Sequence, residues 1–439
     1  MVRSVTPAGR AAGPRLRGGW VGTLGSLGLF IPALVLIAWF AVHRISGLAP
    51  WLADGLRGVI GIEGVARLEE LVYGLEDRFY SFWRRGEKPR AYWAVPSPAP
   101  QQSAPHQRPT APQPALATGA AMLGPLPLGG ETPEPDTTPE VELPRFRPSD
   151  VGPMFKELDA PGDGQWVVLP DRTAPEDARM FKTLLHPDAE RAWAELFVAA
   201  LDLRRVRLHL VAGTLEPQST LPEALDVARP GRVPDELHDG VLAAFNGGFK
   251  TEHGHYGMFV NGVLLVPPVD GMCTIVTTKE GALRIGTWNK LRAETADALW
   301  WRQTPDCMYE NGKINPRLSG RYERKWGSSI DGETVIRRSA IGLDPTGTIL
   351  FVGISNHTTA PAIARGMHHA GAATVAQLDI NFSYPKFVTY QRTQESSLKR
   401  AVPLAEGFEY SDNEYLRKAS HRDFFYVMDS SMDGRTARN

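Results

Sequence analysis

The chain has 439 residues, a length that predicts two or three domains. Hydrophobic residues make up 42% and charged residues 22%, which is the composition of a folded globular protein. Its 48 lysines and arginines almost balance its 49 aspartates and glutamates, so the formal net charge is −1. This balance gives no overall attraction to nucleic acid or to anionic lipid, and we expect no nucleic-acid partner.

The N-terminal region contains one long apolar segment, residues 20–42, which has no charged side chain. Its length is about that of a membrane-spanning helix. Arginines are denser before it than after it, so the positive-inside rule places residues 1–19 in the cytoplasm. A cleaved signal peptide is the alternative, but its apolar core would be shorter, about 7–15 residues. We therefore predict an uncleaved transmembrane signal anchor, with the rest of the chain outside the cytoplasm, in the cell envelope or periplasm.

A second apolar pattern predicts a helix over residues 62–83. Apolar side chains recur there at alternating steps of three and four residues: Val65, Leu68, Val72, Leu75, Phe79 and Phe82. This spacing is typical of a coiled-coil seam, which would join two copies of the chain as a homodimer. An amphipathic helix that lies on the membrane or on the following domain explains the pattern equally well.

A proline-rich stretch separates this helix from the folded part of the chain. Residues 96–148 are rich in Pro, Ala, Gln, Thr and Gly and have almost no aromatic side chains, so they bury too little apolar surface to fold. We expect six segments: a cytoplasmic N-terminus (1–19), the transmembrane anchor (20–42), a juxtamembrane amphipathic helix (43–95), a disordered linker (96–148), a folded domain (149–430) and a flexible tail (431–439).

The folded domain has the pattern of many short strands and few helices. Strand-like segments bounded by turn residues lie at 194–201, 206–211, 273–278, 283–288 and 424–428. By propensity alone, the first of them could also be helical. Two cysteines, Cys273 and Cys307, could form a disulfide outside the cytoplasm or remain separate buried thiols. The expected fold class is α+β, a twisted mixed β-sheet with flanking helices.

One buried strand, at 241–246, delivers polar residues to the end of a sheet. It ends in Asn246-Gly247-Gly248, and paired glycines allow the backbone to approach another group closely. A hairpin with an Asn-Gly turn follows at 258–265. Groups that can bind a substrate or transfer protons lie between the strand and the hairpin: Lys250, His253 and His255. A plain β-turn with surface histidines is the alternative interpretation.

A second polar stretch begins with a predicted strand at 338–343, an Asp-Pro-Thr-Gly turn and a further strand. A Thr-Ala-Pro start and a glycine end then predict a helix over 359–371. The next predicted strand, 374–379, ends in the carboxylate of Asp379.

In this order, the two stretches resemble the phosphodiester glycosidase family. The resemblance spans residues 196–428 and rests on three short motifs: the Asn-Gly-Gly-Phe strand end, the Arg-Ser-Ala-Ile-Gly-Leu-Asp strand and the Leu-Asp strand end. After this Leu-Asp the family has glycines and a serine. Here the sequence is Asp379-Ile380-Asn381-Phe382-Ser383, which keeps the serine and lacks the glycines.

The resemblance implies cleavage of a sugar–phosphate bond at the anomeric carbon. Arg338 would hold the phosphate with its planar guanidinium group, and Asp379 would attack the sugar or activate water. Glu310, in an Asn-Gly turn, is a weaker catalytic candidate. Residues expected to contact the substrate are Asn246, Gly247, Gly248, Lys250, His253, His255, His357, Asn381 and Ser383. No metal or other cofactor is firmly implied, although a divalent cation at Asp379 would suit a carboxylate beside a polar loop.

These residues predict a membrane-anchored, extracytoplasmic hydrolase that cleaves a glycosyl phosphodiester or a related cell-envelope glycan linkage. The altered loop after Asp379 favours an alternative, a non-catalytic glycan-binding or envelope polysaccharide assembly module that retains the fold. Arg338 would then belong to a structural ion pair, and Asp379 to a turn or a cap. The catalytic hypothesis requires Asn246, Arg338 and Asp379 to share one cleft.

Overall fold

The computed structural model describes residues 48–90, 93, 145–170, 175–319, 332–393 and 396–433. The predicted anchor at 20–42 and nearly all of the predicted linker lie outside these residues, as does most of the predicted tail. Among the helices within the described ranges, none is long and apolar enough to cross a membrane.

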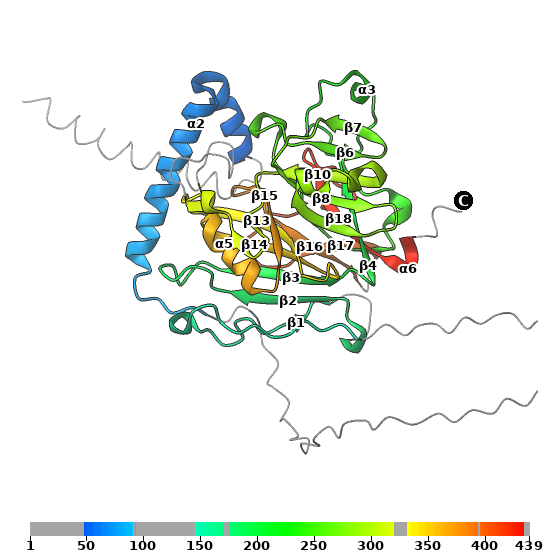
Figure 1. Ribbon diagram of the computed structural model, residues 1–439. Helices are drawn as coiled ribbons and strands as arrows, with labels where there is room; N and C mark the ends of the chain where they lie inside the picture. Colours follow the sequence, from blue (N-terminus) through cyan, green and yellow to red (C-terminus); the bar gives the residue numbers. More distant parts are fainter. Residues whose placement is uncertain are drawn as a thin grey trace, which may run out of the picture.

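The longest helix, α2 (Leu48–Trp83), contains the predicted helix at 62–83 and runs along one side of the folded domain (Figure 1). It contacts the domain through polar side chains: Tyr73 donates a hydrogen bond to Asn381 (2.6 Å), and Asp77 pairs with Arg191 (2.8 Å). Most of the predicted apolar seam is exposed, namely Leu68, Val72, Leu75, Phe79 and Phe82. The homodimer through residues 62–83 stays a prediction.

The other helices are short. The longest of them, α5 (Ala360–His369), starts as predicted, because Thr359 Oγ1 accepts a hydrogen bond from the N–H of Ala362 (3.3 Å). The rest are about one turn long: η1 (Lys156–Leu158), η2 (Pro175–Asp177), α3 (Pro222–Leu225), η3 (Asp235–Leu237), η4 (Thr251–His253), α4 (Trp288–Leu291), η5 (Glu294–Asp297), η6 (Pro316–Ser319) and α6 (Ser430–Asp433).

The strands within the described residues form three sheets. The eight-stranded sheet contains, in spatial order, β1 (Val167–Val168), β2 (Met180–Leu185), β3 (Leu196–Asp202), β14 (Ile349–Thr358), β13 (Ile336–Leu343), β15 (Thr374–Ile380), β11 (Tyr309–Glu310) and β12 (Lys313–Ile314). One five-stranded sheet contains β7 (Val263–Val266), β6 (Met258–Val260), β10 (Ala298–Thr304), β8 (Cys273–Thr278) and β9 (Leu283–Thr287). The other contains β17 (Ser396–Pro403), β16 (Phe387–Thr393), β5 (Val241–Asn246), β18 (Phe424–Asp429) and β4 (Val206–Val211).

The predicted α+β class with a mixed sheet is wrong, because the domain is mainly β and all pairings between its named strands are antiparallel. A strand–helix–strand run such as β14–α5–β15 is typical of a parallel pair. In the structure β13 lies between β14 and β15 and is antiparallel to both. The crossover through α5 therefore joins two strands that are not neighbours.

Side chains from all three sheets meet in the largest hydrophobic cluster. In β3, the odd-numbered side chains from Phe197 to Leu201 join this cluster, and the even-numbered ones from Leu196 to Ala200 pack with α5. A strand buried on both faces has a continuous apolar sequence, which explains why its composition also suited a helix.

A disulfide joins Cys273, at the start of β8, to Cys307, just before β11. The two Cα atoms are 4.7 Å apart. The alternative of two separate buried thiols is therefore wrong. The bridge ties one five-stranded sheet to the segment that enters the far end of the eight-stranded sheet.

Candidate active site

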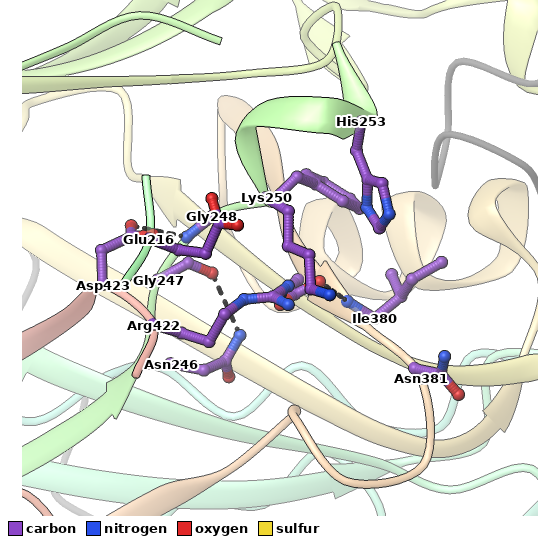
Figure 2. A network of polar contacts seen from close by, with 12 residues as sticks. Glu216, Asn246, Gly247, Gly248, Lys250, His253, Ile380, Asn381, Arg422 and Asp423 are labelled. Carbon is purple, nitrogen blue, oxygen red and sulfur yellow. Dashed lines mark hydrogen bonds and ion pairs between the residues drawn. The ribbon is translucent and has the colours of Figure 1, made fainter. Parts of the chain in front are cut away.

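Three segments that are distant in sequence meet at one point: the end of β5, the end of β15 and the residues before β18 (Figure 2). The N–H of Asp379 donates to the carbonyl of Gly247 (3.0 Å), and the N–H of Gly247 donates to the carbonyl of Asp423 (3.0 Å). These main-chain bonds hold the Asn-Gly-Gly turn against Asp379 and against the dipeptide Arg422-Asp423.

A bulge in β15 sets the direction of the Asp379 side chain. Two residues of β15, Leu378 and Asp379, oppose the single residue Ser339 of β13. An extra residue breaks the regular alternation of a strand and re-aims the side chains beside it. The Asp379 carbonyl accepts a hydrogen bond from Ser339 Oγ (2.6 Å), which fixes the bulged backbone.

The Asp379 carboxylate forms an ion pair with Arg422. Only 4% of Asp379 is exposed, and burial raises the pKa of its carboxyl group to about 6. Arg422 and the N–H of Ile380, which donates to Asp379 Oδ1 (2.9 Å), oppose this shift without cancelling it. Asp379 is therefore mostly ionised at neutral pH and can still take up a proton, which suits a general acid–base group.

Arg422 has unused hydrogen-bonding capacity. Its Nη2 pairs with Asp379, whereas Nε and Nη1 are buried and have no hydrogen-bond partner among the described residues. The ring centroid of Tyr384 lies 4.2 Å from the guanidinium carbon. Burial without a partner is costly for an N–H group, so unpaired buried donors mark a place for a ligand or a water molecule. A phosphate oxygen would match these donors.

The Asn246 side chain is occupied by structural bonds. Its amide nitrogen donates to Ser339 Oγ (2.8 Å), and its amide oxygen accepts from the N–H of Lys386 (3.1 Å). Asn246 thereby joins β5 to β13 and to the segment before β16. In this arrangement it positions the site around Asp379 and has little capacity left for a sugar hydroxyl.

A second ion pair, between Arg302 and Asp423, supports the two glycines. Asp423 Oδ2 accepts bonds from Arg302 Nε (3.0 Å) and from the N–H of Gly248 (2.9 Å). A Cβ atom on Gly247 would lie 2.3 Å from the same carboxylate oxygen, so only glycine allows this approach. Arg302 Nη2 also donates to the carbonyl of Phe249 (2.6 Å), which holds the start of the loop that carries Lys250 and the histidines.

The loop after the glycines brings Lys250 and His253 to the site, as Figure 2 shows. Glu252 Oε1 lies 3.6 Å from Lys250 Nζ and 3.5 Å from His253 Nε2. The positive charge of Lys250 is near enough to Asp379 to oppose the rise in its pKa. His255 is exposed, with a φ of 51°.

The residues after Asp379 connect the site to α2. Asn381 has a φ of 95°, and its side-chain oxygen accepts hydrogen bonds from Tyr73 Oη (2.6 Å) and from the N–H of Phe382 (2.9 Å). Ser383 is partly buried in the same loop. His357 lies against α2 instead, where its Nε2 is 3.2 Å from Asp77 Oδ1.

Arg338 has a different environment from the one expected. It is fully buried, and its Nε and Nη2 donate to the carbonyls of Thr358 (3.2 Å) and Thr334 (2.9 Å), near the start of α5. The cation paired with Asp379 is Arg422. The catalytic hypothesis places Asn246, Arg338 and Asp379 in one cleft. The structure links two of them, Asn246 and Asp379, through Ser339.

Glu310 lies toward the other end of β15. Its strand β11 meets β15 at Val375, which is roughly 13 Å along the strand from Asp379 at 3.3 Å per residue. Glu310 pairs with Lys290 (2.9 Å) and accepts a hydrogen bond from the N–H of Thr287 (3.0 Å). Burial alone would raise the pKa of Glu310, but these contacts hold it below its usual value.

Sequence reasoning missed Arg422, Asp423, Arg302 and Tyr384. The one local signal was a charged dipeptide directly before the buried strand at 424–428. A separation of 43 residues between Asp379 and Arg422 gives no indication that they meet. Within the part of the chain that the structure describes, no group of three or more His, Cys, Asp or Glu side chains could hold a metal ion.

The likeness to known proteins is distant. No family model and no curated protein matches the chain. Among solved structures, it is similar to the zebrafish N-acetylglucosamine-1-phosphodiester alpha-N-acetylglucosaminidase catalytic domain auto-inhibited by a pro-peptide, at 13% identity and a TM-score of 0.36, over 61% of this chain and 87% of that one.

Two other solved structures resemble the chain at 9% identity: a hypothetical protein from Synechocystis (TM-score 0.30, over 54% of this chain and 59% of that one) and a putative exported protein from Burkholderia pseudomallei (TM-score 0.26, over 54% and 74%). At these scores the structural similarity to a glycosidase domain and to the other two proteins is distant.

Proposed function

We propose that the chain is a hydrolase that cleaves a glycosyl phosphodiester or a related anionic glycan linkage. The observation that carries this proposal is Arg422, which pairs with the carboxylate of Asp379 and whose Nε and Nη1 have no hydrogen-bond partner among the described residues. A phosphate needs donors of this kind, and cleavage at an anomeric carbon needs a carboxylate next to it.

In the proposed reaction, Arg422 holds the phosphate and Lys250 supplies a second positive charge. The ionised Asp379 accepts a proton from a water molecule, whose oxygen forms a bond to the anomeric carbon. The bond between this carbon and the phosphate oxygen breaks, and the phosphate monoester leaves with the electron pair. Phosphate is a stable leaving anion, so this step needs no strong general acid. The products are a reducing sugar and a phosphate monoester.

The disulfide supports a site of action outside the reducing cytoplasm. Structural disulfides persist in secreted, periplasmic and cell-surface proteins and are rare in cytosolic ones. The bridge between Cys273 and Cys307 is buried within the domain. We therefore propose that the domain acts in the cell envelope or another oxidising compartment.

One observation favours a second candidate, a non-catalytic glycan-binding or envelope polysaccharide assembly module. Asp379 is only 4% exposed, and the ring of Tyr384 lies over the Arg422 guanidinium. A hydrolase would have to move the loop that carries Tyr384 before a substrate could reach Asp379. A binding module that keeps the fold would have no such requirement.

Incubation of the purified full-length chain with a panel of sugar 1-phosphodiesters tests the proposal, with released reducing sugar as the readout. We expect release by the native chain and none by its Asp379→Asn variant. A parallel reaction with a chelator tests whether a divalent cation takes part. Binding of an intact diester by calorimetry without any release would contradict the hydrolase and favour the binding module.

A further inference from the structure

A cavity of about 210 Å³ lies between α2 and the domain, beside the first residues of β13 and the last residues of β14. It is separate from the Asp379 carboxylate, although Phe382, in the loop after Asp379, forms part of its wall. Pockets for drug-sized ligands measure about 300–1,000 Å³. The smaller volume here suits a single ring.

Aromatic side chains form much of the cavity wall: Tyr80 from α2, and Trp193 and Phe382 from the domain. Trp193 is only 9% exposed, and its indole N–H is buried with no hydrogen-bond partner among the described residues. Buried indole N–H groups usually have a partner. The Trp193 ring lines the cavity, and its indole N–H is enclosed in the wall, so a ligand acceptor would reach this donor only after a shift of the wall.

Arg337 gives the cavity a positive charge. Its guanidinium carbon lies 3.8 Å from the ring centroid of Phe382, and its Nη1 donates to the Phe382 carbonyl (3.0 Å). No carboxylate of the described residues lies within 4.0 Å of its side-chain nitrogens. Burial lowers the pKa of Arg337 to about 10, which still leaves it charged at neutral pH. Glu409 and Glu76 act on Arg337 only at longer range, so the guanidinium has no carboxylate in direct contact and a bound anion would satisfy its free side.

Carboxylates near the cavity offset its arginines: Glu409 and Glu76 act on Arg337, and Glu87 pairs with Arg84. Arg84 lines the cavity and lies 5.2 Å from the ring centroid of Tyr80, with Glu87 at 3.7 Å as its ion-pair partner. Glu76 is the carboxylate in the wall, and it lies near enough to Arg337 to oppose the fall in the pKa of that guanidinium. His357, which also lines the cavity, is engaged with Asp77.

We propose that this cavity binds a small anion that carries a ring, such as a sugar phosphate, with Arg337 on the anionic group and Tyr80 and Trp193 against the ring. The site does not require Asp379 to be catalytic. Because Tyr80 is on α2 and Arg84 follows its last residue, the bound ligand would also hold α2 on the domain.

Isothermal titration calorimetry of the full-length chain with three probes tests this site: glucose 1-phosphate, inorganic phosphate and glucose. We expect glucose 1-phosphate to bind most tightly, since it alone offers both the anionic group and the ring. Arg337→Gln should weaken its binding by about tenfold or more, because a charge-assisted fork is lost. Trp193→Phe, which keeps a ring but removes the N–H, should weaken it by a smaller factor.

Two variants serve as controls. Arg422→Gln removes donors from the site at Asp379, and Arg400→Gln removes an exposed arginine of β17. Arg400→Gln should bind glucose 1-phosphate as the native chain does. Arg422→Gln should keep the binding that Arg337→Gln loses, even if the site at Asp379 also takes up some of the probe. If Arg337→Gln fails to fold, Arg337→Lys, which keeps the charge without the fork, takes its place and should also weaken binding.

The inference is wrong if the native chain does not bind glucose 1-phosphate, or if its affinity is unchanged in the folded Arg337 variants. It is also wrong if Arg422→Gln abolishes binding while Arg337→Gln does not, since the anion then occupies the other site. Equal affinities for phosphate and glucose 1-phosphate would remove the role of the ring. None of these readouts involves turnover, so a chain that hydrolyses no diester can still satisfy them.

Discussion

Two arginine–aspartate pairs meet at the dipeptide Arg422-Asp423, and they differ in how fully their hydrogen bonds are made. Arg302 and Asp423 are completely buried, and every side-chain nitrogen of Arg302 has an acceptor. Arg422 is also largely buried, but it donates to Asp379 from Nη2 alone and leaves Nε and Nη1 without a partner among the described residues.

This difference in hydrogen bonding separates a pair that supports the structure, Arg302–Asp423, from a pair that could bind a ligand, Arg422–Asp379. A saturated pair such as Arg302–Asp423 could bind a ligand only by giving up bonds that hold the loop after the glycines. Arg422 could bind a ligand through its Nε and Nη1 and would weaken only its ion pair with Asp379. The same residue types, joined at adjacent positions of the chain, therefore serve stability in one pair and, in the proposed function, substrate recognition in the other.

The largest expected effect is on stability and comes from the saturated pair. Arg302→Met leaves the Asp423 carboxylate buried without its counter-ion, and loss of one partner of a buried pair costs about 3–5 kcal/mol. The free energy of unfolding from denaturant titration checks this. Arg400→Met, on the surface, is the matched control and should change stability by less than about 1 kcal/mol. A loss of that small size in Arg302→Met would show that this pair does not hold the loop.

The next largest effect is on catalysis and comes from the unsaturated pair. Asp379→Asn keeps the shape of the side chain but removes the base, so turnover of a sugar 1-phosphodiester should fall by about 100-fold or more. The thermal midpoint should not fall. Turnover and thermal midpoint are measured on the same preparation. Normal turnover in a folded Asp379→Asn variant would remove this residue from the reaction.

The pH dependence should distinguish Asp379 from an ordinary carboxylate. Its pKa rises from 3.8 to about 6 in the folded chain, so between these values the native state binds more protons than the unfolded state. The free energy of unfolding should therefore decrease by roughly 1–3 kcal/mol as the pH rises from about 4 to about 6. Above that range, Asp379 should contribute no further change.

Activity should follow the opposite course, since the proposed base must be ionised: turnover rises with pH through about 6. Unfolding titrations at several pH values, on the native chain and on Asp379→Asn, isolate the contribution of this carboxyl group. An identical pH dependence of stability in the two proteins would show that the pKa of Asp379 is not raised.

The smallest expected effect comes from Arg422→Lys. The charge beside Asp379 stays, but the planar fork and its two unpaired donors are lost, so KM should rise by about tenfold with a smaller change in kcat. The matched substitution, Arg302→Lys, should instead lower stability, because a lysine ammonium cannot reach all the acceptors of that guanidinium. A loss of stability in Arg422→Lys with an unchanged KM would make the two pairs alike and remove the distinction between them.

The sequence by itself determined the local features of this domain. Short apolar runs that end in polar residues predicted β5 and β15, and an Asn-Gly pair predicted the hairpin of β6 and β7, where Asn261 and Gly262 have positive φ. A cap and an early proline predicted α5. These features depend on neighbouring residues, whose backbone preferences act over a few positions, and for that reason they are visible in a linear sequence.

Tertiary structure alone decided which segments lie together. The antiparallel order of the sheets, the bridge between Cys273 and Cys307, and the pairing of Asp379 with Arg422 all join segments separated by tens of residues. A polar side chain at a strand end marks where chemistry could occur, and Asp379 was predicted as a site residue in this way. Its partner Arg422 was not predicted. Packing of the whole core brings Arg422 to Asp379, and no local pattern in the sequence indicates this contact.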